Sequence, residues 1–126
     1  PSDLKYTKDH EWARVKGDIA TVGITYFAQH SLTDIVFVEL PEIGRKAEAK
    51  KSIAIVESVK SVSDVFAPVS GQIVEVNSVL SGMPQTVNES PFDKGWIVKI
   101  KISNPKELDE LMDKKKYDEY LKTVEH

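Results

Sequence analysis

A long series of short β-forming runs constrains this chain more than any other feature. Between residues 11 and 102, segments rich in Val, Ile, Phe and Thr alternate with turns of Gly, Pro, Asn and Ser, a pattern typical of β domains. Segments 12–16 and 19–24 are joined by Gly17-Asp18. A two-residue connection with glycine first predicts a hairpin with a type II′ turn. At 126 residues and 40% hydrophobic content, the chain has the size of one globular domain.

The rest of this region continues the pattern with one helical interruption. Thr25 is placed to cap a short helix ending at Leu32, with Phe27, Ala28 and Leu32 on its inward face. Strands are predicted at 35–40, 52–56, 62–67 and 72–77, and again at 96–102, where alternation indicates one buried face. Residues 80–94 are rich in Ser, Gly, Pro and Asn and predict a long excursion with one helical turn.

The C-terminal segment, residues 104–125, changes to a helical period. Asn104 and Glu107 have the spacing of a capping box, with Pro105 at the first helical position. Two apolar stripes should pack on the sheet, because helices this short are marginal alone. Their members are Leu108, Leu111 and Met112, then Tyr117, Tyr120, Leu121 and Val124.

Composition excludes several classes of function. Seventeen basic against twenty acidic residues give a net charge of −3, which argues against nucleic-acid binding. The chain has no cysteine, so any sulfur chemistry must come from an attached group. No apolar run is long enough for a membrane span, and the first residues lack the profile of a secretion signal. We therefore expect an intracellular protein with no membrane association, cytoplasmic in a bacterium or in the mitochondrial matrix in a eukaryote.

The sequence also lacks the common catalytic motifs. It has no phosphate-binding loop, dinucleotide fingerprint or nucleophile elbow. The three histidines, His10, His30 and His126, have no spacing that would join them in a metal site. We expect a structural hydrogen bond for His10 and a solvent-facing helix position for His30.

Lys60 has the most informative context. Residues 53–67 read IAIVESVKSVSDVFA, two apolar strands that meet at a polar tip with the lysine at its centre. Such a hairpin presents a primary amine outward on a rigid support, and an amine can carry a group in a stable amide. Ser58, Ser61 and Ser63 lack a nearby histidine and are interpreted as turn residues.

Several segments of the chain resemble the glycine cleavage H-protein family, a family of lipoyl carriers. They occur in the family's order and spacing over nearly the whole chain: YTKDHEW at 6–12, VGIT at 22–25, DIVFVELP at 34–41, ESVKSVSD at 57–64, APVSG at 67–71, EVN at 75–77, VNESPF at 87–92 and GW at 95–96.

The resemblance implies a mostly β fold, a hybrid barrel-sandwich of two antiparallel sheets, with a short helix near 25–32 and C-terminal helices. It implies one lipoyl-carrier domain over residues 1–126, with a core at about 4–103 and the helical segment at about 104–125. Lipoate would be joined to Lys60 by an amide. The protein would be a carrier and not an enzyme.

The family's partners follow from the same resemblance. The arm would take an aminomethyl group from the pyridoxal-phosphate-dependent glycine decarboxylase and present it to the tetrahydrofolate-dependent aminomethyltransferase. Dihydrolipoamide dehydrogenase would reoxidise the arm, and lipoate-attaching enzymes would install it. Because a carrier must leave each partner, we expect transient contacts and a monomer.

The family's loaded arm lies in a surface cleft that shields its cargo from water. The positions that match the cleft are Glu11, Ile24, Ala28, Leu32 and Asp64. Our hypothesis is that Glu11 holds the ammonium end of the cargo, the alternative being an ordinary surface glutamate.

Departures from the family pattern are few. Thr33 stands where glycine is frequent, which we expect to tighten the exit from the helix. Ser31 replaces a histidine that can occur there, which weakens any role for an imidazole. Ser61 stands where alanine commonly follows the lysine and is small enough not to block a modifying enzyme.

Four alternatives remain open from the sequence. A biotin carrier uses the same hairpin lysine but usually has methionine on both sides, whereas Val59 and Ser61 flank Lys60. A relay protein that passes lipoyl groups to other complexes has the same sequence features. A Schiff-base enzyme would need the lysine pKa lowered, and the nearby charges of Glu57 and Asp64 act in the opposite direction. A purely structural interaction module is the fourth.

Overall fold

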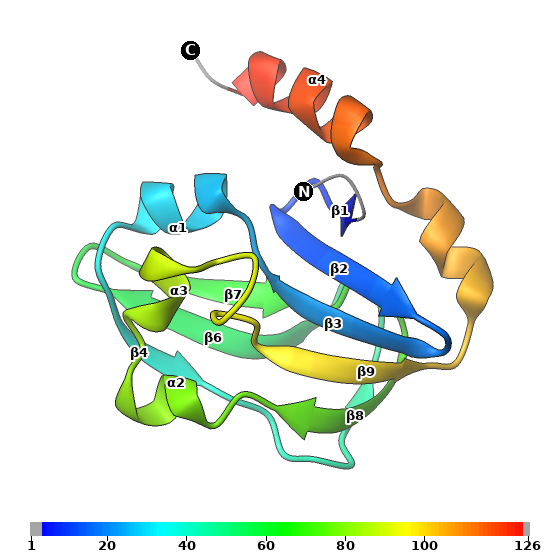
Figure 1. The fold of residues 1–126 in the computed structure, drawn as a ribbon, viewed down its shortest axis with the longest axis horizontal. Helices are drawn as coiled ribbons and strands as arrows, with labels where there is room; N and C mark the ends of the chain where they lie inside the picture. Colours follow the sequence, from blue (N-terminus) through cyan, green and yellow to red (C-terminus); the bar gives the residue numbers. More distant parts are fainter. Residues whose placement is uncertain (1–3, 125–126) are drawn as a thin grey trace.

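The computed structural model describes residues 4–124, and within them the chain forms two antiparallel sheets (Figure 1). The larger sheet has the order β1-β2-β3-β9-β8-β5 and the smaller one β4-β6-β7. The predicted mostly β fold of two antiparallel sheets is therefore confirmed. The strands of the larger sheet are β1 (Lys5–Tyr6), β2 (Glu11–Lys16), β3 (Ile19–Ile24), β5 (Lys46–Ala47), β8 (Gly71–Val76) and β9 (Val98–Ile102), and those of the smaller are β4 (Ile35–Glu39), β6 (Ser52–Ser58) and β7 (Val62–Phe66).

The first hairpin forms as predicted. Lys16 pairs directly with Ile19 across the turn, and Gly17 has φ +62°, the positive value that a turn of this kind requires at its first central residue. Farther along, a Cβ on Gly23 would lie 2.6 Å from the Trp12 ring. Glycine at position 23 is therefore needed to let this indole lie flat on the neighbouring strand.

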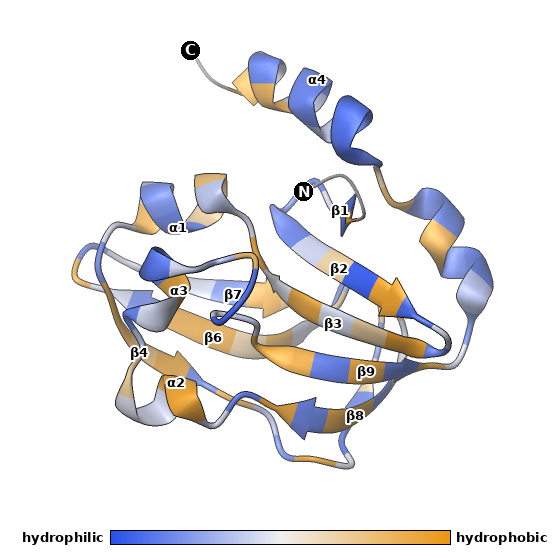
Figure 2. Cartoon of the chain, in the orientation of Figure 1, coloured by the Kyte–Doolittle hydropathy of each residue, from blue (hydrophilic) through white to orange (hydrophobic). Residues whose placement is uncertain are grey.

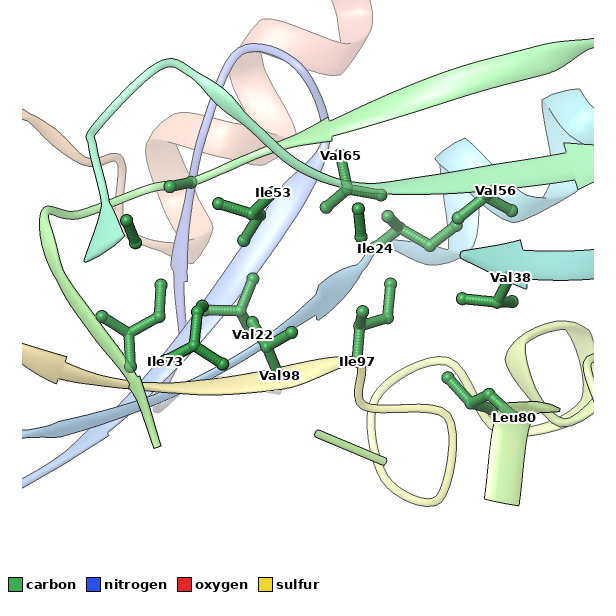
Figure 3. Packing of buried hydrophobic residues seen from close by; sticks show 14 of the residues in the cluster. Val22, Ile24, Val38, Ile53, Val56, Val65, Ile73, Leu80, Ile97 and Val98 are labelled. Carbon is green, nitrogen blue, oxygen red and sulfur yellow. The ribbon is translucent and has the colours of Figure 1, made fainter. Parts of the chain in front are cut away.

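Side chains from both sheets form one hydrophobic core. Figure 3 shows Ile24 and Val22 of β3 in the same layer as Val56 of β6 and Val65 of β7. Figure 2 shows hydrophobic and hydrophilic residues alternating along β9. The predicted alternation over 96–102 is correct from Val98 onward. Ile97, which it placed on the outer face, is fully buried before the strand begins.

The short helix α1 (Tyr26–Leu32) begins at its predicted cap. Thr25 accepts a hydrogen bond from the Ala28 amide at 3.3 Å. Its most buried residue is Gln29, which the predicted inward face of Phe27, Ala28 and Leu32 omits. Gln29 is buried because its side chain accepts a hydrogen bond from Asn88 at 2.8 Å.

Two short helices occupy the long excursion: α2 (Val79–Gly82) and α3 (Thr86–Glu89). The sequence predicted one helical turn in this excursion, and the structure has two short helices there. Asn88 of α3 accepts a hydrogen bond from the Ile35 amide and donates one to the Thr33 carbonyl, each at 2.8 Å. The excursion thus fixes the connection between α1 and β4.

The C-terminal segment differs from the prediction in its first half. Residues Pro105–Glu110 form a 3₁₀ helix, η1, and the Asn104 side chain makes no cap hydrogen bond. The predicted capping box is therefore wrong. The Glu107 carboxylate instead accepts hydrogen bonds from the Ser70 amide and hydroxyl at 2.7 and 2.9 Å, two donors that the tertiary fold brings from a distant turn.

Helix α4 (Lys114–Val124) lies beside the start of the chain (Figure 1). Tyr117 joins Leu4, Tyr6 and Trp12 in a second buried cluster, with Tyr120 and Leu121 packed at its border. Val124, the last member of the predicted stripe, is exposed, because it lies beyond this cluster. No helix within residues 4–124 is both long and apolar enough to cross a membrane.

Candidate functional site

Lys60 lies at the tip of the β6–β7 hairpin, in a turn that one serine closes. β6 extends to Ser58, two residues beyond the predicted end. The Ser58 hydroxyl accepts hydrogen bonds from the amides of Lys60 and Ser61 at 3.1 and 2.9 Å and donates to the Ser61 carbonyl at 3.1 Å. Of the three serines interpreted as turn residues, Ser61 lies in the turn, whereas Ser58 is the last residue of β6 and Ser63 belongs to β7. The turn is therefore fixed while its lysine side chain is exposed.

The Lys60 amine faces the C-terminal end of α1. Its Nζ donates to the Ser31 carbonyl at 3.5 Å, and the Val59 amide donates to the Asp34 carbonyl at 3.1 Å. Helix carbonyls at this end carry partial negative charge, which favours a cation there. The acceptor is the backbone carbonyl of residue 31, so this contact does not depend on the serine side chain.

The other end of α1 lies next to Glu11. Glu11 and Ile24 are directly paired on β2 and β3, and the Thr25 amide donates to the His10 carbonyl at 2.9 Å. A helix of seven residues is about 10 Å long. α1 therefore leads from the tip lysine to the backbone of residues 10 and 11.

Glu11 is buried, with 2% of its surface exposed, and its carboxyl has two partners. The Thr7 hydroxyl donates to Oε1 at 2.6 Å, and the Phe66 amide of β7 donates to Oε2 at 3.3 Å. Burial raises the pKa of Glu11 to about 7, although both hydrogen bonds act in the opposite direction. Loss of hydration disfavours the charged form more than these two donors favour it.

A cavity of about 330 Å³ adjoins Glu11. Its walls come from the segment before β2, the end of β7 and the C-terminal helical segment, and include Thr7, Lys50, Phe66 and Met112. A carboxyl at the wall of a cavity can meet a small cation without being exposed to bulk water. A positive group placed there would lower the Glu11 pKa and bind to its charged form.

The remaining residues of the predicted cleft lie in different environments. Ile24 belongs to the hydrophobic core, and Ala28 and Leu32 are partly buried against it along α1. Asp64 is exposed, and its carboxylate accepts a hydrogen bond from the Ser52 hydroxyl at 2.9 Å on the adjacent strand. The structure thus pairs Glu11 with Ile24 at the strand end that leads into α1, and it gives Asp64 a partner within its own sheet. The other four predicted cleft residues do not line the cavity at Glu11.

Several residues that shape this site had no role predicted from the sequence. Thr7, four residues before Glu11, donates to its carboxyl, and Asn88 fixes the end of α1. Thr7 and Asn88 belong to the family-like motifs YTKDHEW and VNESPF. The motifs marked both positions, but they did not indicate which groups the two side chains would bind. The predicted hydrogen bond of His10 is confirmed, with the Tyr117 hydroxyl at 2.8 Å, and His30 is exposed as expected.

Thr33, the departure at the exit of α1, has φ +67°. This region is unfavourable for a β-branched residue and open to glycine. The conformation gives a physical reason for glycine at this position, and the backbone turns here from α1 into β4.

Comparisons with known proteins all point to one family. The family model for glycine cleavage H-protein matches residues 4–124. The glycine cleavage system H protein of Symbiobacterium thermophilum is 53% identical over 122 residues, which cover 97% of this chain and 95% of that protein. The H protein of Xanthobacter autotrophicus is 54% identical over 123 residues, 98% of each chain. A crystal structure of the H protein from Mycobacterium marinum superposes with a TM-score of 0.87 at 41% identity, covering 94% of this chain and 96% of that one. This chain therefore belongs to the glycine cleavage H-protein family.

Proposed function

We propose that the protein is the lipoyl-bearing carrier of a glycine cleavage system, with lipoate joined to the Lys60 side chain by an amide. The observation that carries the proposal is the placement of an exposed amine on a closed hairpin turn, at one end of a helix whose other end is hydrogen-bonded to the backbone beside the buried Glu11. Family membership supports a carrier that catalyses no step itself. The domain assignment, 1–126 with its core at about 4–103, is part of the proposal.

The residues at the tip fit a lipoyl group. The chain has no cysteine that could exchange with a dithiolane, and both neighbours of Lys60 leave its amine accessible. When attached, the group supplies the sulfur that takes up the aminomethyl cargo. The chain's own part is to hold the attachment point still, to lead the arm along α1, and to protect the cargo.

We assign Glu11 to the protection of the cargo. Ile24, Ala28 and Leu32 would contact the hydrocarbon of the arm, with Asp64 on the neighbouring strand, and the Glu11 carboxylate would bind the ammonium end. A cation in this site restores the charged form of Glu11, and the pair then excludes water from the hydrolysable carbon. A pair of this kind is stronger in a partly buried site than on the surface.

The proposed partners are those of the family's cycle: glycine decarboxylase, aminomethyltransferase, dihydrolipoamide dehydrogenase and the enzymes that attach lipoate. Each must bind and release the carrier, so we propose a monomer with small, transient interfaces. The similar proteins named above are bacterial, which supports a cytoplasmic location.

Intact mass spectrometry tests the attachment. The purified chain is incubated with lipoate, ATP and a lipoate ligase, then digested and mapped. We expect one lipoyl increment on Lys60, none in Lys60→Arg, and a full increment in Lys94→Arg, which changes an exposed lysine in another turn. No increment on the unaltered chain, with a ligase active on another acceptor, would exclude lipoyl attachment. Modification by biotin and a biotin ligase instead would support the biotin-carrier alternative.

A further inference from the structure

The hydroxyl of Tyr117 joins the segment before β2 to the start of α1. Tyr117 is 4% exposed on α4, and its oxygen lies 2.8 Å from His10 Nδ1 and 2.8 Å from Thr25 Oγ1. Its ring stacks on Tyr6 with centroids 4.4 Å apart and planes 5° apart. A residue near the end of the chain is thus bonded to two segments near its beginning.

The bond to His10 fixes the turn that supports Glu11. The His10 amide donates to the Thr7 carbonyl at 3.2 Å, and Thr7 in turn donates to the Glu11 carboxyl. His10 has φ +68°, an unfavourable value for a residue with a side chain, so the turn needs bonds from outside to keep its shape. Tyr117 supplies one of them, and packing on Phe27, 4.4 Å between ring centroids, supplies another.

The bond to Thr25 fixes the start of α1. Thr25 caps this helix and receives the hydrogen bond of the Ala28 amide. A Thr25 hydroxyl that donates to Tyr117, and a Tyr117 hydroxyl that donates to His10, would satisfy all three groups in one chain of hydrogen bonds. The Tyr117 hydroxyl therefore adds a side-chain link to the backbone bond by which the Thr25 amide already holds the His10 carbonyl.

We propose that Tyr117 is a positioning residue for Glu11. Its hydroxyl holds the turn at residues 7–10 against the cap of α1 and thereby keeps the Thr7 hydroxyl in place on the Glu11 carboxyl. The inference rests on the proposed function, since the quantity that it controls is protection of the cargo. Helix α4 thus contributes to the site although it contains none of the predicted cleft residues.

The variant Tyr117→Phe tests the hydroxyl, because it keeps the stacked ring. The lipoylated protein is loaded with glycine and the pyridoxal-phosphate decarboxylase, separated from the enzyme, and followed by release of formaldehyde. In this reaction water breaks both the carbon–sulfur and the carbon–nitrogen bond, its oxygen becomes that of formaldehyde, and a thiol and ammonium are released with no oxidant required. We expect release about fivefold faster, the effect of losing one hydrogen bond. The control Tyr26→Phe, on an exposed tyrosine of α1, should release at the unaltered rate.

A double variant separates positioning from general loosening. If Tyr117 acts through Glu11, then Tyr117→Phe adds no acceleration in a Glu11→Gln background. If Tyr117→Phe raises the release rate a further fivefold in the Glu11→Gln background, the proposal is overturned. It is also overturned if Glu11→Gln accelerates release and Tyr117→Phe alone leaves the rate unchanged.

A second measurement does not depend on the cargo. The backbone amide of Phe66 binds Glu11 Oε2, so its NMR shift reports the titration of that carboxyl. We expect Tyr117→Phe to move the titration midpoint and Tyr26→Phe to leave it. If Glu11→Gln alone releases cargo at the unaltered rate, the proposed role of Glu11 fails. The Phe66 titration then decides the positioning role by itself, and an unmoved midpoint overturns it.

Discussion

Replacing the Glu11 carboxyl by an amide should change how the stability of the folded protein depends on pH. The pKa of Glu11 is about 7 in the folded state, against 4.5 for an unperturbed glutamate. Between these two pH values the folded protein keeps a proton that the unfolded chain releases. The corresponding stability is fully present below pH 4.5 and is lost as the pH rises to about 7.

The size of this effect follows from the raised pKa. Each unit of pKa difference is worth about 1.4 kcal/mol, so Glu11 should lower the free energy of unfolding by about 3 kcal/mol between pH 4.5 and 7.5. Burial lowers the pKa of His10, and this group acts with the opposite sign, adding stability as the pH rises through the range below 6.5. His10 is present in both proteins and cancels from their difference.

Urea unfolding at several pH values between 4.5 and 8 measures the difference. Over this pH range the free energy of unfolding of the unaltered protein should fall by about 3 kcal/mol more than that of Glu11→Gln. A pH-independent difference in stability between the two proteins does not affect this comparison. The control Glu119→Gln, on the exposed face of α4, should follow the unaltered protein. Parallel curves for the unaltered protein and Glu11→Gln would refute the argument that burial dominates the energetics of this carboxyl.

Three further substitutions test the supports of the site. Ser58→Ala should cost about 1–2 kcal/mol of stability and slow lipoylation, because two amides of the tip turn lose their acceptor; unchanged modification kinetics would contradict this. Asn88→Ala leaves the Ile35 amide without its partner and should cost about 2 kcal/mol in urea unfolding, with faster hydrogen exchange at that amide as its signature. Thr33→Gly should raise stability by about 1 kcal/mol by removing the strain of a positive φ, and a lower melting temperature would show that no strain is relieved.

Much of the fold could be predicted because its determinants are local. Gly17-Asp18 specifies a tight turn between two apolar runs, and Thr25 specifies a helix start, from the conformations available to a few adjacent residues. The hairpin around Lys60 could be predicted for the same reason. The two-residue strands β1 and β5 escaped prediction, because strands this short form only where a neighbouring strand already offers its backbone.

In the candidate site, too, some features follow from the local sequence and others only from the tertiary structure. The sequence by itself determined that Lys60 is presented at a hairpin tip and that a glutamate stands at the start of β2. Only the tertiary structure decided that Glu11 is a buried carboxyl with a pKa near 7, because its loss of hydration sums over β1, β7 and the C-terminal helical segment. It also decided that Tyr117 bonds to His10, 107 residues away. The local sequence pattern sets a residue's place in a strand or turn. The charge and the partners of its side chain depend on atoms that the fold brings from far along the chain.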